Sequence, residues 1–183
     1  MNDMDYKGKL LITKPILEDP FFSKSVIYIT DYNKEKGTVG FILNKIYTKK
    51  LSDLMPGIEA DTAVYMGGPV NQDHLFVIHS RPDIIKGGVK ISDNYFWSGD
   101  YDQIKLSINK NLIGKNEIRF FIGYSGWREG QLENEMKRED WLIYDDPQLN
   151  ILEWDKNLWK NELIKMDKTN IIWVNSPSNP QLN

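Results

Sequence analysis

The residues best able to perform chemistry in this 183-residue chain are its two histidines, His74 and His79. An imidazole can act as an acid, a base or a metal ligand near neutral pH. If residues 74–79 form a strand, the two side chains lie on opposite faces and cannot share a metal ion. We therefore predict no metal site. Two interpretations of His79 stay open: a buried histidine that donates to a backbone carbonyl, which we favour, and an acid or base in a pocket.

Ser125 is the second candidate for chemistry, because it lies in the segment G-Y-S-G-W at 123–127. A hydrolase nucleophile elbow has the pattern G-x-S-x-G, in which the second glycine permits a strained turn. Trp127 occupies the position of that glycine. The pattern is therefore incomplete, and we do not predict a catalytic serine.

A phosphate-binding turn is the third candidate, because three glycines at 123, 126 and 130 follow a predicted strand. Dinucleotide sites have the spacing G-x-G-x-x-G, whereas this chain has G-x-x-G-x-x-x-G. Glu129, Glu133 and Glu135 surround the start of the following helix, where acidic groups compete with a bound anion. We predict no cofactor and no catalytic residues. Whether the protein is an enzyme stays open, and the incomplete motifs favour a protein that is not one.

The elements that position these residues lie between Ile118 and Met136. Alternation over 118–122 predicts a strand, the glycines at 123, 126 and 130 predict a break, and a helix is expected from Gln131. Such an arrangement can form a binding site or simply turn a corner, and we favour the corner slightly. Gly123, Gly126 and Trp127 are then architectural: the glycines permit the turn, and the indole fixes it to the sheet.

The same stretch resembles a known family. G-Y-S-G-W-R-E-G-Q-L-E-N-E at 123–135 is similar to the signature of the YqgE/AlgH family, and four other segments match in order. These segments are G-K-L-L-I-T-K-P-I-L-E-D-P-F-F, G-T-V-G-F-I-L-N-K, V-Y-M-G-G-P-V and H-L-F-V-I-H. The resemblance implies a compact mixed α/β domain and a bacterial source. The family is labelled as transcriptional regulators, and no biochemical activity is implied.

Composition limits the class of protein. The net charge is −3, and the densest basic run covers only residues 45–50. Nucleic-acid binders usually present a strongly basic face, so direct nucleic-acid binding is not expected. Cysteine is absent, the first apolar run is too short for a signal peptide, and no run reaches the ~18 residues of a membrane span. We expect a cytoplasmic protein, monomeric or weakly self-associating, with a protein or small-molecule partner.

The order of predicted elements favours an α+β fold: one compact domain with a mixed, mostly antiparallel or barrel-like sheet and a few helices. We expect this domain to cover residues 1–175, followed by a disordered tail at 176–183. Two helices are expected, one capped by Ser98 or Asp100 and one capped by Asp155. The predicted strands cover residues 9–13, 25–32, 38–44, 63–66, 74–79, 89–91, 118–122, 141–144 and 171–174, and a helical turn is expected at 51–54.

Two functional hypotheses remain. The first is a regulatory or interaction protein without catalytic activity. The second is a module or enzyme that binds a small metabolite or nucleotide near the glycine-rich segment. Its candidate ligand-binding residues come from separate segments and must converge for the hypothesis to hold: Asn44, Gly67, His79, Tyr124, Trp127 and Gln131.

Overall fold

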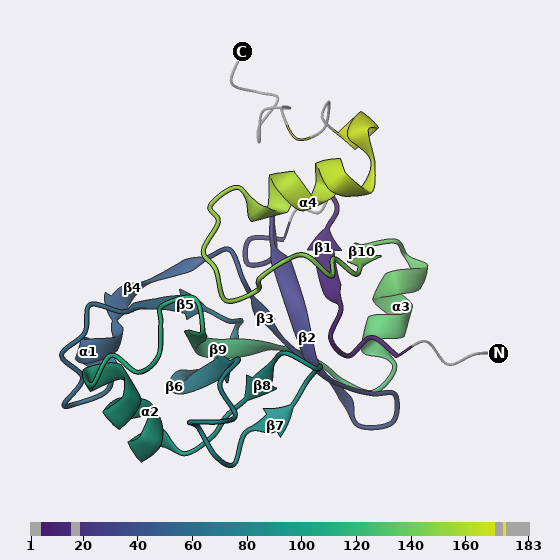
Figure 1. Ribbon diagram of the computed structural model, residues 1–183. Coiled ribbons are helices and arrows are strands. Elements are labelled where there is room, and N and C mark those ends of the chain that lie inside the picture. The colour runs from purple at the N-terminus through teal and green to yellow at the C-terminus, as the bar shows by residue number, and fades with distance from the viewer. Residues whose placement is uncertain (1–4, 16–18, 171–173, 175–183) are drawn as a thin grey trace.

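The computed structural model describes residues 5–15, 19–170 and 174 (Figure 1). Ten strands form one sheet, in which most neighbours are antiparallel and β5 is parallel to β9. The strands are β1 Leu10–Thr13, β2 Val26–Asn33, β3 Gly37–Ile42, β4 Ile46–Lys50, β5 Ala63–Met66, β6 Val70–His79, β7 Val89–Lys90, β8 Phe96–Trp97, β9 Ile118–Trp127 and β10 Trp141–Tyr144.

In the described part of the chain, four α-helices and one 3₁₀ helix accompany the sheet. They are α1 Leu51–Leu54, α2 Tyr101–Asn109, α3 Gln131–Lys137, α4 Leu158–Met166 and the 3₁₀ helix Lys168–Asn170. In Figure 1, α1 and α2 lie together at one end of the molecule, whereas α3 and α4 lie near β10 and β1. The predicted α+β class with a mixed, mostly antiparallel sheet is confirmed. Among the described residues, every helix is too short or too polar to span a membrane.

The sheet is an open path, β10-β1-β2-β3-β9-β6-β8-β7, with β5 and β4 as a branch. One half of β9 lies between two strands, because its residues 120–122 pair with β5 on one edge and with β6 on the other. Its other half, residues 125–127, pairs with β3. β9 is therefore the central strand of the molecule, and both of its ends lie at polar clusters described below.

The predicted break at Gly123 and Gly126 was wrong, because β9 continues without interruption to Trp127. Gly123 has a φ of +65°, and a Cβ there would lie 2.5 Å from the carbonyl oxygen of Gly68. The turn into α3 instead occurs at Gly130, which has a φ of +67°. Gly123 in β9 thus permits close approach of another backbone, and neither Gly123 nor Gly126 turns the chain.

The other backbone is the link between β5 and β6, which crosses β9 from one edge to the other. Gly67 N–H donates to the Ile122 carbonyl at 2.8 Å, and its own carbonyl accepts from Ile42 N–H at 2.9 Å. A Cβ on Gly68 would lie 2.0 Å from the carbonyl carbon of Tyr124. Gly67, Gly68 and Gly123 therefore serve a crossing of two backbones in direct contact.

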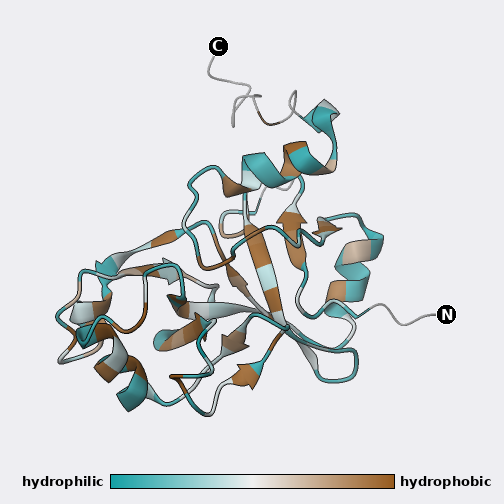
Figure 2. Cartoon of the chain, viewed as in Figure 1, coloured by the Kyte–Doolittle hydropathy of each residue, from teal (hydrophilic) through white to brown (hydrophobic). Residues whose placement is uncertain are grey.

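β9 also contributes to all three hydrophobic clusters of the core. Phe121 packs in the cluster beneath α4, Phe120 in the cluster beneath α2, and Trp127 in the cluster beneath α3. Figure 2 shows hydrophobic residues along β1 and β2, whereas α4 presents many hydrophilic residues outward. Helices with one apolar face pack on the sheet in this way because burying that face removes apolar surface from water.

Several predicted elements are confirmed: the hairpin of β2 and β3, the helical turn α1, and strands β1, β5 and β10. β6 begins at Val70, four residues before its predicted start, and β3 ends at Ile42 rather than residue 44. Strands β4 and β8 were missed. Asp100 caps α2, whereas Asn157 rather than Asp155 is the N-cap of α4. The strand predicted for 171–174, apart from Val174, and the tail at 176–183 lie outside the described residues.

Candidate functional site

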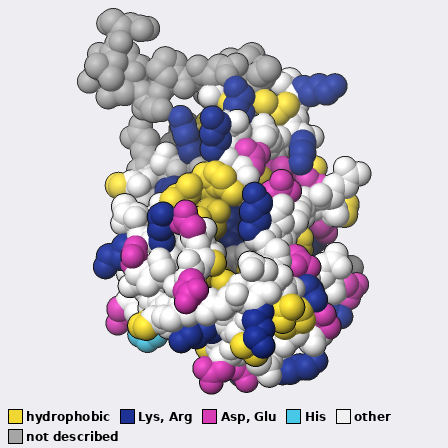
Figure 3. Space-filling view, turned by 60° about the vertical axis from the view of Figure 1, so that its left-hand side comes forward, with side chains coloured by type: hydrophobic (Ala, Val, Ile, Leu, Met, Phe, Trp, Pro, Cys, Tyr) yellow, Lys and Arg dark blue, Asp and Glu magenta, His cyan; other side chains and the backbone are white. Residues whose placement is uncertain are grey.

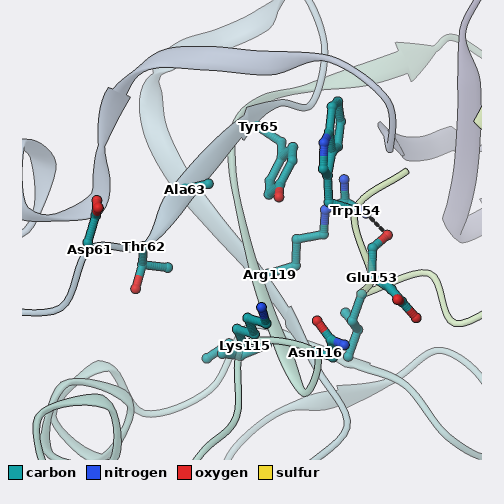
Figure 4. Close-up of a pocket in the computed structure, with 11 residues that line it drawn as sticks. Asp61, Thr62, Ala63, Tyr65, Lys115, Asn116, Arg119, Glu153 and Trp154 are labelled. Atoms are coloured by element: carbon teal, nitrogen blue, oxygen red, sulfur yellow. Dashed lines mark hydrogen bonds between the residues drawn. The ribbon is translucent and has the colours of Figure 1, made fainter. Parts of the chain in front are cut away.

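The largest fully buried side chain is that of Arg119, near the start of β9, and it lines a cavity of about 360 Å³ (Figure 4). The cavity lies between β5, the loop before β9, and the segment that precedes α4. Its lining residues are Asp61, Thr62, Ala63, Tyr65, Lys115, Asn116, Ile118, Arg119, Leu152, Glu153 and Trp154. We call this space the Arg119 cavity.

The Arg119 side chain is held by backbone carbonyls and by an aromatic ring. Its Nη1 donates to the carbonyls of Ile151, at 2.7 Å, and Glu153, at 3.3 Å, and its Nη2 donates to the carbonyl of Leu43. The guanidinium carbon lies 3.8 Å from the ring centroid of Tyr65, a cation–π distance. Arg119 thus joins β9 to the end of β3 and to the loop after β10.

The charge of Arg119 has no carboxylate partner among the described residues, and its Nε–H has no hydrogen-bond acceptor there. Only 2% of the residue is exposed, and a buried arginine without an acidic partner is rare. Burial lowers the pKa of Arg119 to about 10, and the adjacent Tyr65 opposes that shift. The group is therefore still a cation at neutral pH, and the cavity has a positively charged wall.

A second cation, Lys115, lies in the same cavity. Its ammonium has no hydrogen-bond or ion-pair partner within the described part of the chain. In Figure 4, Asn116 lies beside Lys115, and the Glu153 carboxylate lies farther to the right, beyond Asn116. The remaining acid, Asp61, pairs with Lys50 at 2.8 Å and is thereby neutralised.

This arrangement suits the binding of an anion more than catalysis. Lys115 offers a mobile ammonium, Asn116 an amide, and Arg119 a fixed positive charge that no acid of the described chain neutralises. Charge-assisted hydrogen bonds of this kind are stronger than neutral ones, especially where water is excluded. Within the described residues, no three metal-ligating side chains are grouped so that they could hold a metal ion.

The predicted site residues Trp127 and Gln131 lie together at the opposite end of β9, in a closed network around Glu135. Glu135 Oε2 accepts from the indole N–H groups of Trp127, at 2.7 Å, and Trp141, at 2.8 Å. Gln131 Nε2 donates to Glu135 Oε1 at 2.9 Å, and Gln131 Oε1 accepts from Arg128 N–H. A cavity of about 230 Å³ adjoins these side chains, whose polar groups are already paired with one another.

The other predicted site residues do not join that pair. Gly67 and Tyr124 lie at the crossing of the two backbones, where the buried Ser125 Oγ donates to the Gly67 carbonyl at 3.0 Å. Asn44 ties β2 to the turn after β3, since its Oδ1 accepts from Val26 N–H at 2.9 Å and its Nδ2 donates to the Lys24 carbonyl at 2.7 Å. The six residues therefore occupy at least three separate places.

His79 lies at the far end of β9 from Trp127, paired with Ile118. Its ring is fully buried and stacks on Phe96 with 5.8 Å between centroids. Nδ1 accepts from Arg81 N–H at 3.1 Å, and Nε2 has no partner among the described residues. Burial lowers the pKa of His79, so the ring is neutral at pH 7. The ring thus accepts a hydrogen bond from a backbone N–H, and a backbone hydrogen bond with Ser98 opposes the lowering of the His79 pKa.

Sequence reasoning missed the Arg119 cavity. The one available signal was a charged residue between Ile118 and Phe120 in a strand otherwise made of apolar residues. Alternation places Arg119 on the same face as Phe121, which marked it as buried. Its companions Tyr65, Lys115 and Trp154 come from other segments, and no spacing in the sequence links them to it.

Comparisons with known proteins agree with this fold. The family model described as AlgH-like matches residues 10–170. A UPF0301 protein of Chlorobium limicola is 39% identical over 178 residues, which cover 96% of this chain and 95% of the relative. One from Cytophaga hutchinsonii is 34% identical, over 97% of this chain and 98% of the relative.

Two solved structures share the fold. The AlgH protein from Pseudomonas aeruginosa has a TM-score of 0.71 and 23% identity, over 97% of each chain. A Corynebacterium diphtheriae protein has a TM-score of 0.73 and 18% identity, over 96% of this chain and 95% of its own. At these identities the likeness concerns the fold alone. The family model and the curated relatives establish that this chain belongs to the AlgH-like family.

Proposed function

We propose that this protein acts by binding, as an interaction or regulatory protein, and that it takes a small anionic ligand in the Arg119 cavity. The observation that supports the proposal is the presence of two cations in one cavity, neither with a carboxylate partner among the described residues. A ligand that carries a carboxylate or a phosphate would supply the missing negative charge.

The energetics favour this proposal over a purely structural role for both cations. Burying a charged group is costly unless it is paired, and backbone carbonyls compensate Arg119 only in part. Lys115 contributes nothing to the hydrogen bonds that hold the fold. An anion between them would form a charge-assisted hydrogen bond with Lys115. The positive charge of Arg119 would also attract the anion, because the space is partly enclosed.

The regulatory role is part of the same proposal. An anion bound to this protein can change the protein's affinity for a partner protein, provided that the anion binds two conformations of the protein with different affinities.

Direct DNA binding is not part of the proposal, because the net charge of the chain is −3. A gel shift at low salt, showing tight, sequence-specific binding by the purified protein alone, would replace this proposal. The proposal also includes a cytoplasmic location, and the absence of cysteine is compatible with that location.

The second possible ligand site, at Trp127 and Gln131, is less suited to binding a ligand than the Arg119 cavity is. The hydrogen-bonding groups of Trp127, Trp141 and Gln131 are already engaged with Glu135 and Arg128. A ligand there would have to break bonds that hold α3 to the sheet, whereas a ligand in the Arg119 cavity would use donors that are not engaged.

The test is a thermal-shift titration with inorganic phosphate at constant ionic strength. The wild-type melting temperature should rise with phosphate, because a ligand that binds only the folded state stabilises it. Lys115→Met should remove most of the rise. Lys110→Met is the matched control, since Lys110 is another exposed lysine of the same connection outside the cavity. Equal shifts in all three proteins, or none in the wild type, would overturn the proposal.

A further inference from the structure

One wall of the Arg119 cavity is formed by an aromatic side chain that is not needed to complete the core. Trp154 is 36% exposed, one of the few large hydrophobic side chains with that exposure. Its ring packs on Tyr65, with 5.3 Å between centroids and 36° between planes. Its indole N–H has no hydrogen-bond partner within the described part of the chain.

One face of the molecule carries both exposed hydrophobic and basic side chains. Figure 3 shows a group of exposed hydrophobic side chains with lysine and arginine side chains beside it, on the side of the molecule turned forward from the left of Figure 1. In Figure 4 the Trp154 ring and the Lys115 ammonium lie at opposite ends of the Arg119 side chain. The cavity thus offers a flat apolar surface at one end and a cation at the other.

The size of the cavity limits what can fill it. About 360 Å³ lies near the small end of the range of small-molecule sites, roughly 300–1,000 Å³. A bare inorganic anion would leave most of that space and the exposed indole unused. A ring system joined to an anionic group by a short linker would contact both ends.

We infer that the Arg119 cavity takes a ligand in which a planar aromatic ring is joined to a phosphate or carboxylate. The ring stacks on the exposed part of Trp154, beside the guanidinium of Arg119, and the anionic group is held by Lys115 and Asn116. Aromatic rings and bases stack on tryptophan without regard to their detailed substitution. This inference rests on the proposed function, since it assigns the ligand class of the same cavity.

The experiment compares matched pairs of probes that differ only in the ring. Adenosine 5′-monophosphate is compared with ribose 5-phosphate, and indole-3-acetate with acetate, by isothermal titration calorimetry. In the wild type, the ring-bearing member of at least one pair should bind about tenfold more tightly than its partner. The phosphate pair and the carboxylate pair together show which anionic group the cavity takes.

Trp154→Leu should reduce the preference for the ring to about twofold or less, while leaving the affinity for ribose 5-phosphate or acetate within about twofold of the wild type. Leucine keeps an apolar cover over Tyr65, and a melting curve verifies that the variant folds. Tyr101→Leu is the control, because Tyr101 is an exposed aromatic residue outside the cavity. It should leave the preference unchanged.

The outcomes separate the two proposals. If phosphate binding depends on Lys115 but the ring adds nothing, the ligand class is wrong and the proposed function stands. A ring preference that survives Trp154→Leu also overturns the inference, because stacking on that indole is its basis. If no probe binds and phosphate gives no thermal shift, both proposals fail. A ring preference lost only in Trp154→Leu supports the inference.

Discussion

At the Trp127 end of β9, a carboxylate, two indoles and an amide form a closed set of hydrogen bonds around Glu135. At the Arg119 end, the buried guanidinium donates to backbone carbonyls and lies among aromatic rings, and Lys115 in the same cavity has no partner among the described residues. The first cluster contains Trp127, Gln131 and Glu135 of the family signature at residues 123–135, whereas the residues of the second cluster lie outside that signature.

The difference teaches that the recognisable motif and the candidate site are separate features of one strand. A fully paired polar network holds elements together and rigidifies them. A polar cluster with unengaged donors, next to a cavity, is better suited to recognition. Four predictions test this comparison, beginning with the largest effect on stability.

Trp127→Ala should destabilise the fold by about 3–5 kcal/mol, the usual cost of truncating a buried large aromatic side chain. Trp127 is only 6% exposed and packs against Phe22 and Trp141. Urea denaturation followed by circular dichroism measures the loss. Trp154→Ala at the other end of β9 should cost much less. If the two variants melt within a few degrees of each other, the proposed contrast between the two clusters is wrong.

Glu135→Leu should cost about 2–4 kcal/mol, because it leaves the indole N–H groups of Trp127 and Trp141 without an acceptor, at about 1–3 kcal/mol each. The same denaturation measurement applies. Glu129→Leu is the control, since Glu129 is exposed and precedes the same helix. Equal stability of both variants would show that the network around Glu135 does not hold α3 in place.

Glu162 on α4 also has a buried side-chain atom without a hydrogen bond, but it lies outside the Arg119 cavity. It shows whether such an atom is enough to indicate a ligand site. Its Oε2 has no partner among the described residues, and its Oε1 accepts from Lys165, which also pairs with Asp146. Burial raises the pKa of Glu162, against the opposing effect of Lys165. The folded chain therefore holds this proton more tightly than the unfolded chain. That contribution to stability is present below the ordinary glutamate pKa of 4.5 and is lost as pH rises through the raised pKa.

Glu162→Gln cannot titrate at this position, so it should lose less stability than the wild type as pH rises from about 4.5 toward neutrality. Melting curves across that range measure the difference, and Asp146, which also raises the pKa of Glu162, is kept in both proteins. Glu129→Gln replaces an exposed glutamate, so its melting temperature should change with pH in the same way as that of the wild type. Parallel curves for Glu162→Gln as well would show that the Glu162 proton does not contribute to stability.

Lys115→Met should have the smallest effect on stability, within about 0.5 kcal/mol, as is usual for surface substitutions away from special features. Its effect on phosphate binding should nevertheless be large. Denaturation and the phosphate titration on the same sample measure both quantities. A loss of several kcal/mol would show that Lys115 stabilises the fold and would remove the distinction between the two ends of β9.

The sequence by itself was sufficient for the local elements and for the family. Short runs of apolar, β-branched and aromatic residues predicted β1, β2 and β10, and apolar spacing predicted α4, because these signals depend only on neighbouring residues. The two short strands β4 and β8 could not be predicted in this way. Each is held by pairing with a distant partner, β4 with β5 and β8 with β6 and β7.

The glycines of β9 show the same limit. Gly123 and Gly126 interrupt the apolar pattern, which predicted a turn, yet the strand continues because another backbone crosses it at Gly68. Nothing in the sequence distinguishes a glycine that turns the backbone from a glycine that lets two backbone segments of the same chain touch. The physical reason is that both uses require only the absence of a Cβ.

The sequence determined the fold class, the family, and the architectural role expected of Trp127, because these follow from composition, periodicity and a contiguous motif. Only the tertiary structure decided where unengaged donors lie. Arg119, Lys115, Tyr65 and Trp154 come from three segments up to about ninety residues apart, and their charges and rings become one cavity only when the sheet and the segment before α4 pack together. A binding site depends on distances between side chains in space, and those distances are set by the packing of the whole chain.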